Sequence, residues 1–293
     1  MRYAILSDVH GNDEALGAVL ADVDAINRQP GGRIDQLWCL GDIVGYGPEP
    51  GECVRWIRQR ADVCIPGNHD WAAVGKINLD EFSGAAAESA EWTRERLQPD
   101  QRVFLRSLPD RSQVGDFTLA HGSPSNPIWE YLITPGGAAP NFAAFETLFC
   151  VVGHTHLPTI FLQPTSEKGM MYAALQRHKP RRHYLSMATP GGPSWNTMEH
   201  EAVELLGSAD WARCERLMPG PGLWLLPHGY RAIINPGSVG QPRDGDPRAS
   251  YVIYDSAVGF EFRRVPYDIA ATQAKIHARG LSAQLANRLA KGL

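Results

Sequence analysis

Short apolar runs alternate with amphipathic stretches along most of the chain. Residues 2–7 form an apolar run typical of a buried strand, and residues 13–28 place apolar side chains three and four positions apart, as an amphipathic helix does. The same patterns predict further strands over residues 34–40, 62–66, 117–121, 149–153, 231–235, 250–255 and 259–265, and further helices over residues 52–60, 82–107 and 268–291. Pro99 and Gly280 should interrupt the last two helices. The alternation predicts an α/β core, to which the last two strands add an antiparallel hairpin.

Residues 163–228 depart from this alternation. They contain two Pro/Gly-rich stretches, at residues 190–193 and 219–222, and only the part from about 197 to 217 has a pattern that a helix could adopt. We therefore expect a single domain over residues 1–293 that carries an insertion or cap at 163–228.

Composition narrows the class of protein. Hydrophobic residues make up 43% of the chain and charged residues 20%, which is ordinary globular usage. The formal net charge of −4 argues against a general affinity for nucleic acid or acidic membranes. No apolar run approaches the length of about 18 residues that a membrane helix needs. The five cysteines form no CxxC pair, and no signal peptide follows Met1, so we expect a cytoplasmic protein.

Five polar clusters follow predicted strands. They are Asp8-Val9-His10, Gly41-Asp42, Gly67-Asn68-His69-Asp70, His121-Gly122 and Gly153-His154-Thr155-His156. The carboxyl ends of strands are where open α/β sheets build their sites. An extended backbone would point Asp8 and His10 to one side, and His154 and His156 repeat this spacing. The neighbouring glycines would let the backbone turn sharply and approach an ion.

These clusters form an inventory of metal ligands. With His69 and Asp70 set aside, they supply two carboxylates, one amide and four imidazoles. One four-coordinate ion cannot use seven ligands, whereas two ions that share a carboxylate can. Nitrogen and oxygen ligands without thiolate suit Mn, Fe, Co, Ni or Zn. Two such ions about 3.5–4 Å apart can hold a hydroxide nucleophile and clamp the oxygens of a phosphate ester. His69 would then assist departure of the alkoxide, and Asp70 could orient it.

The motifs DxH, GDxxGYG, GNHD, a strand-end HG and GHTH, in this order, resemble those of the calcineurin-like metallophosphoesterases. The run NPGSVGQPRDGDPRASY at residues 235–251 is similar to the small bacterial and archaeal phosphodiesterase branch of that superfamily. The resemblance covers residues 1–162 and 231–280. It implies a four-layer α-β-β-α sandwich with mixed sheets and a dinuclear metal centre. It also implies that one ion is held by Asp8, His10, Asp42 and His156, and a second by Asp42, Asn68, His121 and His154, with His69 assisting the leaving group.

Several residues keep two interpretations open. Asp70 could cap the helix that follows it instead of acting in catalysis. Asn12 and Tyr46 could contact substrate or only pack a loop. Arg243 could bind phosphate in bidentate fashion, or it could form a salt bridge with the charged residues around it. The basic run at residues 177–183 could collect a polyanionic substrate or form a solvated surface loop.

The first functional hypothesis is hydrolysis of phosphodiesters by a hydroxide held between two divalent transition-metal ions. We expect manganese, with iron, nickel or zinc as alternatives, and a small phosphate ester as substrate. The second hypothesis is a phosphomonoesterase acting on phosphoproteins or nucleotides, which would need an extra cation such as Arg243. The third is a non-catalytic protein-binding scaffold. Such a scaffold is expected to lose ligands, and this sequence keeps all seven.

Overall fold

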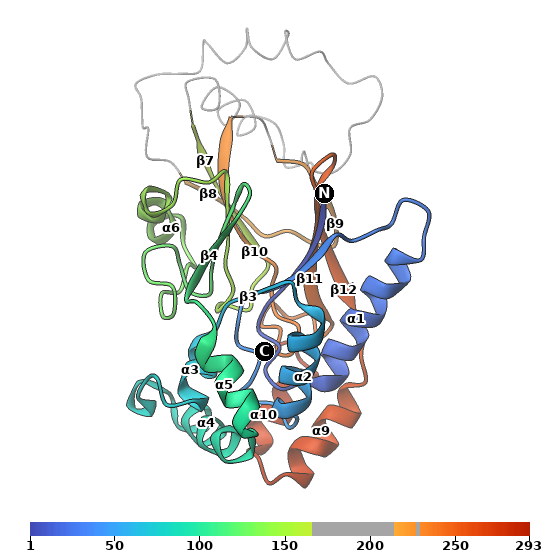
Figure 1. Ribbon diagram of the computed structural model, residues 1–293, viewed down its shortest axis with the longest axis vertical. Coiled ribbons are helices and arrows are strands. Elements are labelled where there is room, and N and C mark those ends of the chain that lie inside the picture. Colours follow the sequence, from blue (N-terminus) through green and yellow to red (C-terminus); the bar gives the residue numbers. More distant parts are fainter. Residues whose placement is uncertain (166–213, 227–228) are drawn as a thin grey trace, which may run out of the picture.

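Two six-stranded sheets form the centre of the computed structural model, which describes residues 1–165, 214–226 and 229–293 (Figure 1). The sheets pack face to face, and helices cover their outer faces. Both sheets contain parallel and antiparallel neighbours. This confirms the expected α/β sandwich with four layers and mixed sheets.

The first sheet has the order β3-β2-β1-β11-β12-β9. Its strands are β1 (Arg2–Leu6), β2 (Gln36–Cys39), β3 (Val63–Cys64), β9 (Gly222–Trp224), β11 (Ala249–Asp255) and β12 (Gly259–Val265). The strands β1, β2 and β3 run parallel, and β11 pairs with β1 and β12 in antiparallel fashion. The predicted hairpin of the last two strands is therefore confirmed.

The second sheet has the order β4-β5-β6-β10-β7-β8. Its strands are β4 (Arg111–Val114), β5 (Phe117–Ala120), β6 (Phe149–Val151), β7 (Thr159–Pro164), β8 (Glu215–Leu217) and β10 (Tyr230–Asn235). Three of them, β5, β6 and β10, run parallel, while β4, β7 and β8 pair in antiparallel fashion.

The helices lie mostly where the periodicity places them. The described α-helices are α1 (Asp13–Asn27), α2 (Pro50–Arg60), α3 (Asn68–Ala73), α4 (Gly84–Arg96), α5 (Pro99–Ser107), α6 (Pro135–Asn141), α9 (Ile269–Ala278) and α10 (Ala283–Leu289), with 3-10 turns at Leu79–Glu81 and Phe142–Ala144. Pro99 stands at the start of α5, where its missing N–H has no intrahelical partner to lose. Gly280, with φ +72°, separates α9 from α10. None of the described helices has the length and apolar character that crossing a bilayer requires.

The period-two alternation of β1 explains how the layers are held together. Tyr3 and Ile5 point into the core between the sheets, whereas Ala4 and Leu6 pack in the cluster that includes the buried face of α1. The outer face of the second sheet is covered by a smaller cluster that includes Phe142. Burial on both faces of the first sheet leaves its strand ends as the places where polar groups can gather.

Part of the segment predicted as an insertion belongs to the sheets. β8 pairs with β7 and β9 pairs with β12, so residues 215–217 form a strand where the sequence suggested the end of a helix. Three-residue edge strands are too short to leave a periodic signal. The register of β7 against β10 pairs Thr159 with Asn235 and Pro164 with Tyr230. The last residue of β7 therefore lies beside the first residue of β10. The chain leaves β7 at the end of the sheet that is opposite to the carboxyl ends of β6 and β10. The remainder of the predicted insertion, residues 166–213 and 227–228, lies outside the described residues.

Candidate metal centre

The five polar clusters meet where five parallel-running strands end. Asp8 and His10 follow β1, Asp42 follows β2, and Asn68 begins α3 directly after β3. In the second sheet His121 follows β5, while His154 and His156 follow β6. All seven side chains are buried. Backbone hydrogen bonds fasten neighbouring loops, since Asp8 donates its N–H to the carbonyl of Gly41 at 3.0 Å and Gly153 donates to that of His121 at 2.8 Å.

Distances divide the histidines and carboxylates into two groups. The first ligand group consists of Asp8, His10, Asp42 and His156, and the second ligand group consists of Asp42, His121 and His154. Within each group the candidate ligand atoms lie within 4.8 Å of one another. Asp42 belongs to both groups, as a carboxylate shared by two ions would.

The two histidines of the first ligand group face each other through their Nε2 atoms, which lie 3.0 Å apart. The Nδ1 atom of His10 lies 3.2 Å from the carbonyl oxygen of Val44, and that of His156 lies 2.6 Å from the carbonyl oxygen of Gln241. A carbonyl can only accept, so each ring donates from Nδ1 and presents a lone pair at Nε2. Two lone pairs at this distance repel unless a cation or a proton lies between them.

The second ligand group is oriented in the same way. His121 directs Nδ1 to the carbonyl oxygen of Leu40 at 2.8 Å and places Nε2 3.3 Å from Oδ2 of Asp42. His154 uses its other nitrogen, because its Nε2 atom lies 3.2 Å from the carbonyl oxygen of Trp129. Its Nδ1 atom is thereby left for the interior of the group. Each imidazole is held by one carbonyl, which fixes the tautomer that a metal ligand needs.

Asn68 adds an oxygen without a partner. Its Oδ1 atom is buried and accepts no hydrogen bond from any of the described residues. A buried amide oxygen without a hydrogen bond is destabilising, by about 1–3 kcal/mol, unless another positive group meets it. A cation held beside this oxygen would satisfy it.

The electrostatic field at the two groups favours positive charge. Burial and the neighbouring carboxylate of Asp42, opposed by His121, together raise the pKa of Asp8 to about 7. Burial lowers the pKa of His121, but the carboxylates of Asp42 and Asp8 outweigh it and raise this pKa to about 10. Two carboxylates shielded from water can both ionise only when cations compensate them.

The backbone of the site is strained. Among the described residues other than glycine, a positive φ occurs at Asp8, His10, Asp42, Tyr46, His154 and His156. Such left-handed conformations cost about 1–3 kcal/mol each and persist where the surroundings enforce them. The expectation that extended backbone aligns Asp8 with His10 is therefore wrong, since their φ angles are +55° and +51°. Left-handed turns bring them together, and His154 and His156 are directed to different ligand groups.

Two of the glycines are required by close contacts. A Cβ atom added to Gly67 would lie 2.0 Å from Oδ1 of Asp42, and one added to Gly153 would lie 2.0 Å from Oγ of Ser7 and 2.8 Å from Oδ2 of Asp8. Relieving these contacts would displace the carboxylates of Asp42 and Asp8, which are candidate ligands. The expected close approach of the glycine backbone to the site is confirmed at these positions.

His69 and Asp70 have separate surroundings. His69 donates its backbone N–H to Oδ1 of Asp42 at 2.9 Å, and burial lowers the pKa of its imidazole to about 4. Asp70 accepts the N–H of Gly67 at 2.9 Å and that of Val44 at 3.1 Å, one with each carboxylate oxygen. Asp70 therefore holds the start of α3 and makes no hydrogen bond that would orient His69. The contacts favour the helix-capping alternative for Asp70.

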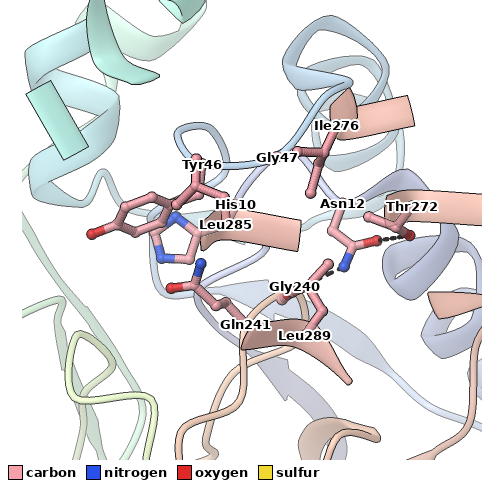
Figure 2. A pocket seen from close by; sticks show the side chains of 10 residues that line it. All are labelled: His10, Asn12, Tyr46, Gly47, Gly240, Gln241, Thr272, Ile276, Leu285 and Leu289. Carbon is pink, nitrogen blue, oxygen red and sulfur yellow. Dashed lines mark hydrogen bonds between the residues drawn. The ribbon is translucent and has the colours of Figure 1, made fainter. Parts of the chain in front are cut away.

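The side chain of Asn12 is held by hydrogen bonds to other parts of the fold. Its Oδ1 atom accepts the N–H of Ala15 and the hydroxyl of Thr272, both at 3.1 Å, and its Nδ2 atom donates to the carbonyl of Gly240 at 2.9 Å. Figure 2 shows the amide directed toward Thr272 and Gly240, away from the imidazole of His10. These contacts cap α1 and join it to α9, which favours the loop-packing alternative for Asn12.

Arg243 is not neutralised by the acids beside it. Asp244 forms an ion pair with Arg264, and Asp246 forms one with Arg248 at 2.6 Å. Arg243 donates instead to Oε1 of Gln241 at 3.1 Å, and no carboxylate among the described residues forms a salt bridge with it. The salt-bridge alternative is therefore not observed. The basic run at residues 177–183 lies outside the described part of the chain.

Sequence reasoning missed the contribution of the segment between β5 and α6. The carbonyl of Trp129 holds His154, and the ring of Tyr131 stacks on the same imidazole with centroids 3.8 Å apart. A backbone carbonyl carries no side-chain signal. The aromatic pair at residues 129 and 131 is visible in the sequence, but nothing in its spacing links it to His154.

The chain is similar to known phosphoesterases. The family model described as calcineurin-like phosphoesterase matches residues 1–184. An uncharacterised protein of Methanocaldococcus jannaschii is 34% identical over 295 residues, which span 99% of this chain and 97% of that protein. The crystal structure of a metallophosphoesterase from Sphaerobacter thermophilus has a TM-score of 0.73 and 41% identity, and the match covers 100% of this chain and 99% of that one.

A more distant similarity concerns nucleotide hydrolases. A symmetrical bis(5'-nucleosyl)-tetraphosphatase of Shewanella baltica is 29% identical over 144 residues. The match spans 44% of this chain and 46% of that protein, so each contributes less than half of its length.

Proposed function

Because the chain belongs to the calcineurin-like phosphoesterases, and is thus a metal-dependent phosphoric ester hydrolase, we propose that it hydrolyses phosphodiesters at a dinuclear metal centre. The observation that carries this proposal is the position of Asp42 in both ligand groups. A single carboxylate shared between two sets of nitrogen and oxygen donors is the arrangement that places two ions side by side.

The donors fit such a centre. The first ligand group would hold one ion, with the facing Nε2 atoms of His10 and His156 as two of its ligands. The second ligand group would hold the other ion together with the unpartnered Oδ1 atom of Asn68. Nitrogen and oxygen donors without thiolate suit manganese, which we propose as the native metal, and also iron, nickel and zinc. When bound, the two ions would supply a hydroxide nucleophile at neutral pH and neutralise charge on the phosphoryl oxygens.

Two further side chains would serve the substrate. His69 is fastened to Asp42 through its backbone N–H, and its neutral imidazole carries one N–H that can be donated to the departing oxygen. Arg243 donates its backbone N–H to the carbonyl of His156 at 3.4 Å and its guanidinium to Oε1 of Gln241, so it lies beside the first ligand group. Because no carboxylate among the described residues pairs with Arg243, its guanidinium can donate two hydrogen bonds to a phosphate.

A paired rate assay tests the proposal. The protein is stripped of metal, reloaded with Mn²⁺, and supplied with bis(p-nitrophenyl) phosphate or p-nitrophenyl phosphate. We expect faster hydrolysis of the diester, and we expect a chelator to abolish it. Two bound ions without turnover of either ester would contradict the proposal.

Faster hydrolysis of the monoester would favour a second candidate, a phosphomonoesterase acting on phosphoproteins or nucleotides. A monoester carries one more negative charge than a diester and needs an additional cation, which Arg243 could supply. The similarity to a symmetrical bis(5'-nucleosyl)-tetraphosphatase supports nucleotides as the class to try first.

The role of His69 is tested separately. His69→Asn should keep both ions, because the residue supplies no ligand to either group, and should slow hydrolysis of a diester with a poor leaving group by about a hundredfold. Metal content and the rate on an alkyl diester are the two measurements. Full activity of this variant on the alkyl diester would show that His69 does not assist the leaving group.

A further inference from the structure

Three aromatic side chains lie beside His69 and His154. We call Phe82, Trp129 and Tyr131 the aromatic border. Tyr131 stacks on the imidazole of His154 with an interplanar angle of 26°. Phe82 meets the imidazole of His69 edge to face with centroids 5.0 Å apart, and it meets Trp129 in a similar way at 5.3 Å. The border therefore connects the histidine that would serve the leaving group with a member of the second ligand group.

The aromatic border is partly exposed to solvent. Tyr131 is 50% exposed, the neighbouring Ile133 is 44% exposed, and Phe82 and Trp129 are half-buried. Single exposed apolar side chains are ordinary, but a connected set beside buried polar ligands marks a place where a ligand can cover apolar surface. The rings come from two separate segments, one before α4 and one between β5 and α6, so sequence proximity alone does not account for their meeting.

The aromatic border has charged and metal-binding side chains on one side and apolar rings on the other. Tyr131 contacts His154, and Arg243 donates its backbone N–H to the carbonyl of His156, two residues further along the same loop, at 3.4 Å. On one side stand the two ligand groups and Arg243, which suit a phosphate. On the other side stand flat apolar rings, which suit a planar ring stacked on them. A molecule that fits both sides has an anionic end and an aromatic end.

We propose that the aromatic border stacks a nucleobase, so that the substrates are nucleotide esters whose base lies over Tyr131 and beside Phe82. The inference rests on the proposed function for the position of the phosphate. A base is joined to its phosphate through one sugar, and Phe82 and Tyr131 each touch an imidazole of the site. A phosphate bound at the ligand groups would therefore bring its base to the border. Stacking accepts any base, because every base has a π-face.

Equilibrium binding tests this inference without requiring turnover. AMP and ribose 5-phosphate carry the same phosphate and the same sugar and differ by the base. Calorimetric titration of the Mn²⁺-loaded protein should show AMP binding about 5- to 100-fold more tightly, the range expected for one stacked base. Recovery of intact ligand afterwards shows that binding alone was measured.

Variants identify the rings responsible. Tyr131→Ala and Phe82→Ala should each bring the ratio of the two dissociation constants toward one, whereas Tyr131→Phe should keep it. Because Phe82 contacts His69 and Tyr131 contacts His154, a loss of metal caused by one variant does not affect the other. Val258→Ala, at an exposed position beyond β11, is the matched control and should leave the ratio unchanged.

The possible outcomes separate the two proposals. Equal binding of AMP and ribose 5-phosphate by a protein that hydrolyses diesters would overturn the stacking inference and leave the proposed function standing. A preference for AMP without metal-dependent hydrolysis would overturn the proposed function and support the border as a base-binding surface. Tighter binding of octyl phosphate than of AMP would overturn the inference, because it would show that the border selects flexible aliphatic groups.

Discussion

The two ligand groups share Asp42 but differ in how they are covered. In the first group, His10 lines a small pocket together with Tyr46 and Gln241, and apolar side chains of α9 and α10 line the same pocket (Figure 2). In the second group, the ring stacked on His154 belongs to Tyr131, which is half exposed. Helices α9 and α10 line the pocket beside His10 of the first group, whereas a loop with an exposed aromatic ring borders the second.

This difference should affect how the two groups exchange their ions. A site beside packed helices exchanges its ion slowly when release requires the packed side chains to separate. A site bordered by an exposed ring can admit an ester beside its ion. We therefore expect the ion of the first group to exchange more slowly than that of the second.

The most damaging change should be the one that removes the shared member. Asp42→Asn keeps the size of the side chain but removes the charge that balances both ions. We expect loss of both ions and a fall in activity on the order of a thousandfold. Metal analysis after gel filtration, together with the diester assay, measures both effects. Retention of two ions by this variant would contradict a bridging role for Asp42.

Changes confined to one group should separate them. His154→Ala should release the ion of the second group, leave the first occupied, and lower activity by about a hundredfold. Loss of an ion should lower the stability of either variant, because a bound ion stabilises the folded state by about 2.7 kcal/mol at a hundred times its dissociation constant. His156→Ala should lower thermal stability further, because it also removes the buried hydrogen bond to the carbonyl of Gln241. Metal stoichiometry and melting temperature are measured for both variants. Identical behaviour of the two would show that enclosure does not distinguish the groups.

The fold was predictable where burial imposes a period. β1 and α1 follow their apolar patterns closely, since each buries a defined face. The three-residue strands β8 and β9 leave no such pattern. The helix α6 has the sequence PGGAAPN, which intrinsic propensity disfavours. Thr134 caps it and burial of Ala138 fixes it, so tertiary contacts decide its conformation.

The candidate ligands were predictable because Asp, Asn and His side chains can bind metal ions in any backbone conformation. How they are aimed was not predictable. The left-handed turns at Asp8 and His10 replace the extended backbone that their spacing suggested. The carbonyls of Val44 and Gln241 orient two of the imidazoles, and a carbonyl has the same identity in every residue. Asn12 and Asp70 are the kinds of residue that bind ligands or cap helices, and only their contacts favour the second role.

A smaller effect should follow from loosening the wall of the first group. Asn12→Ala removes the cap of α1 and the buried hydrogen bonds to Thr272 and Gly240. We expect a loss of about 2–3 kcal/mol in the free energy of unfolding, measured by urea denaturation. Activity per folded molecule should change little, because the amide faces away from His10. The control is Asn78→Ala, which removes an exposed cap and should change stability much less. A large rise in KM for the diester would instead assign Asn12 to the substrate.

The smallest effect should come from an ionic cluster outside both ligand groups. Its effect on stability shows what a substitution that does not involve metal does, for comparison with substitutions in the two groups. Burial raises the pKa of Asp22, but hydrogen bonds from Arg263 and Tyr251 outweigh it and hold this pKa below its ordinary value. The Nε atom of Arg263 lies 2.8 Å and the Tyr251 hydroxyl 2.5 Å from Oδ2 of Asp22. Asp22→Asn should therefore lower stability by about 1 kcal/mol at pH 7, without loss of metal.

The pH dependence of that difference has a definite sign. A carboxyl whose pKa is lower in the folded state contributes its full stability above its unfolded pKa of about 3.9, and loses it as the pH falls through the folded value. The free energies of unfolding of the wild type and Asp22→Asn should thus differ by a constant amount from pH 5 to pH 7 and converge below about pH 4. Asp100→Asn removes an exposed ion pair with Arg58 and should show little difference at any pH. A gap for Asp22→Asn that widened in acid would mean that this carboxyl is protonated more easily in the folded protein, and that its contacts with Arg263 and Tyr251 do not form.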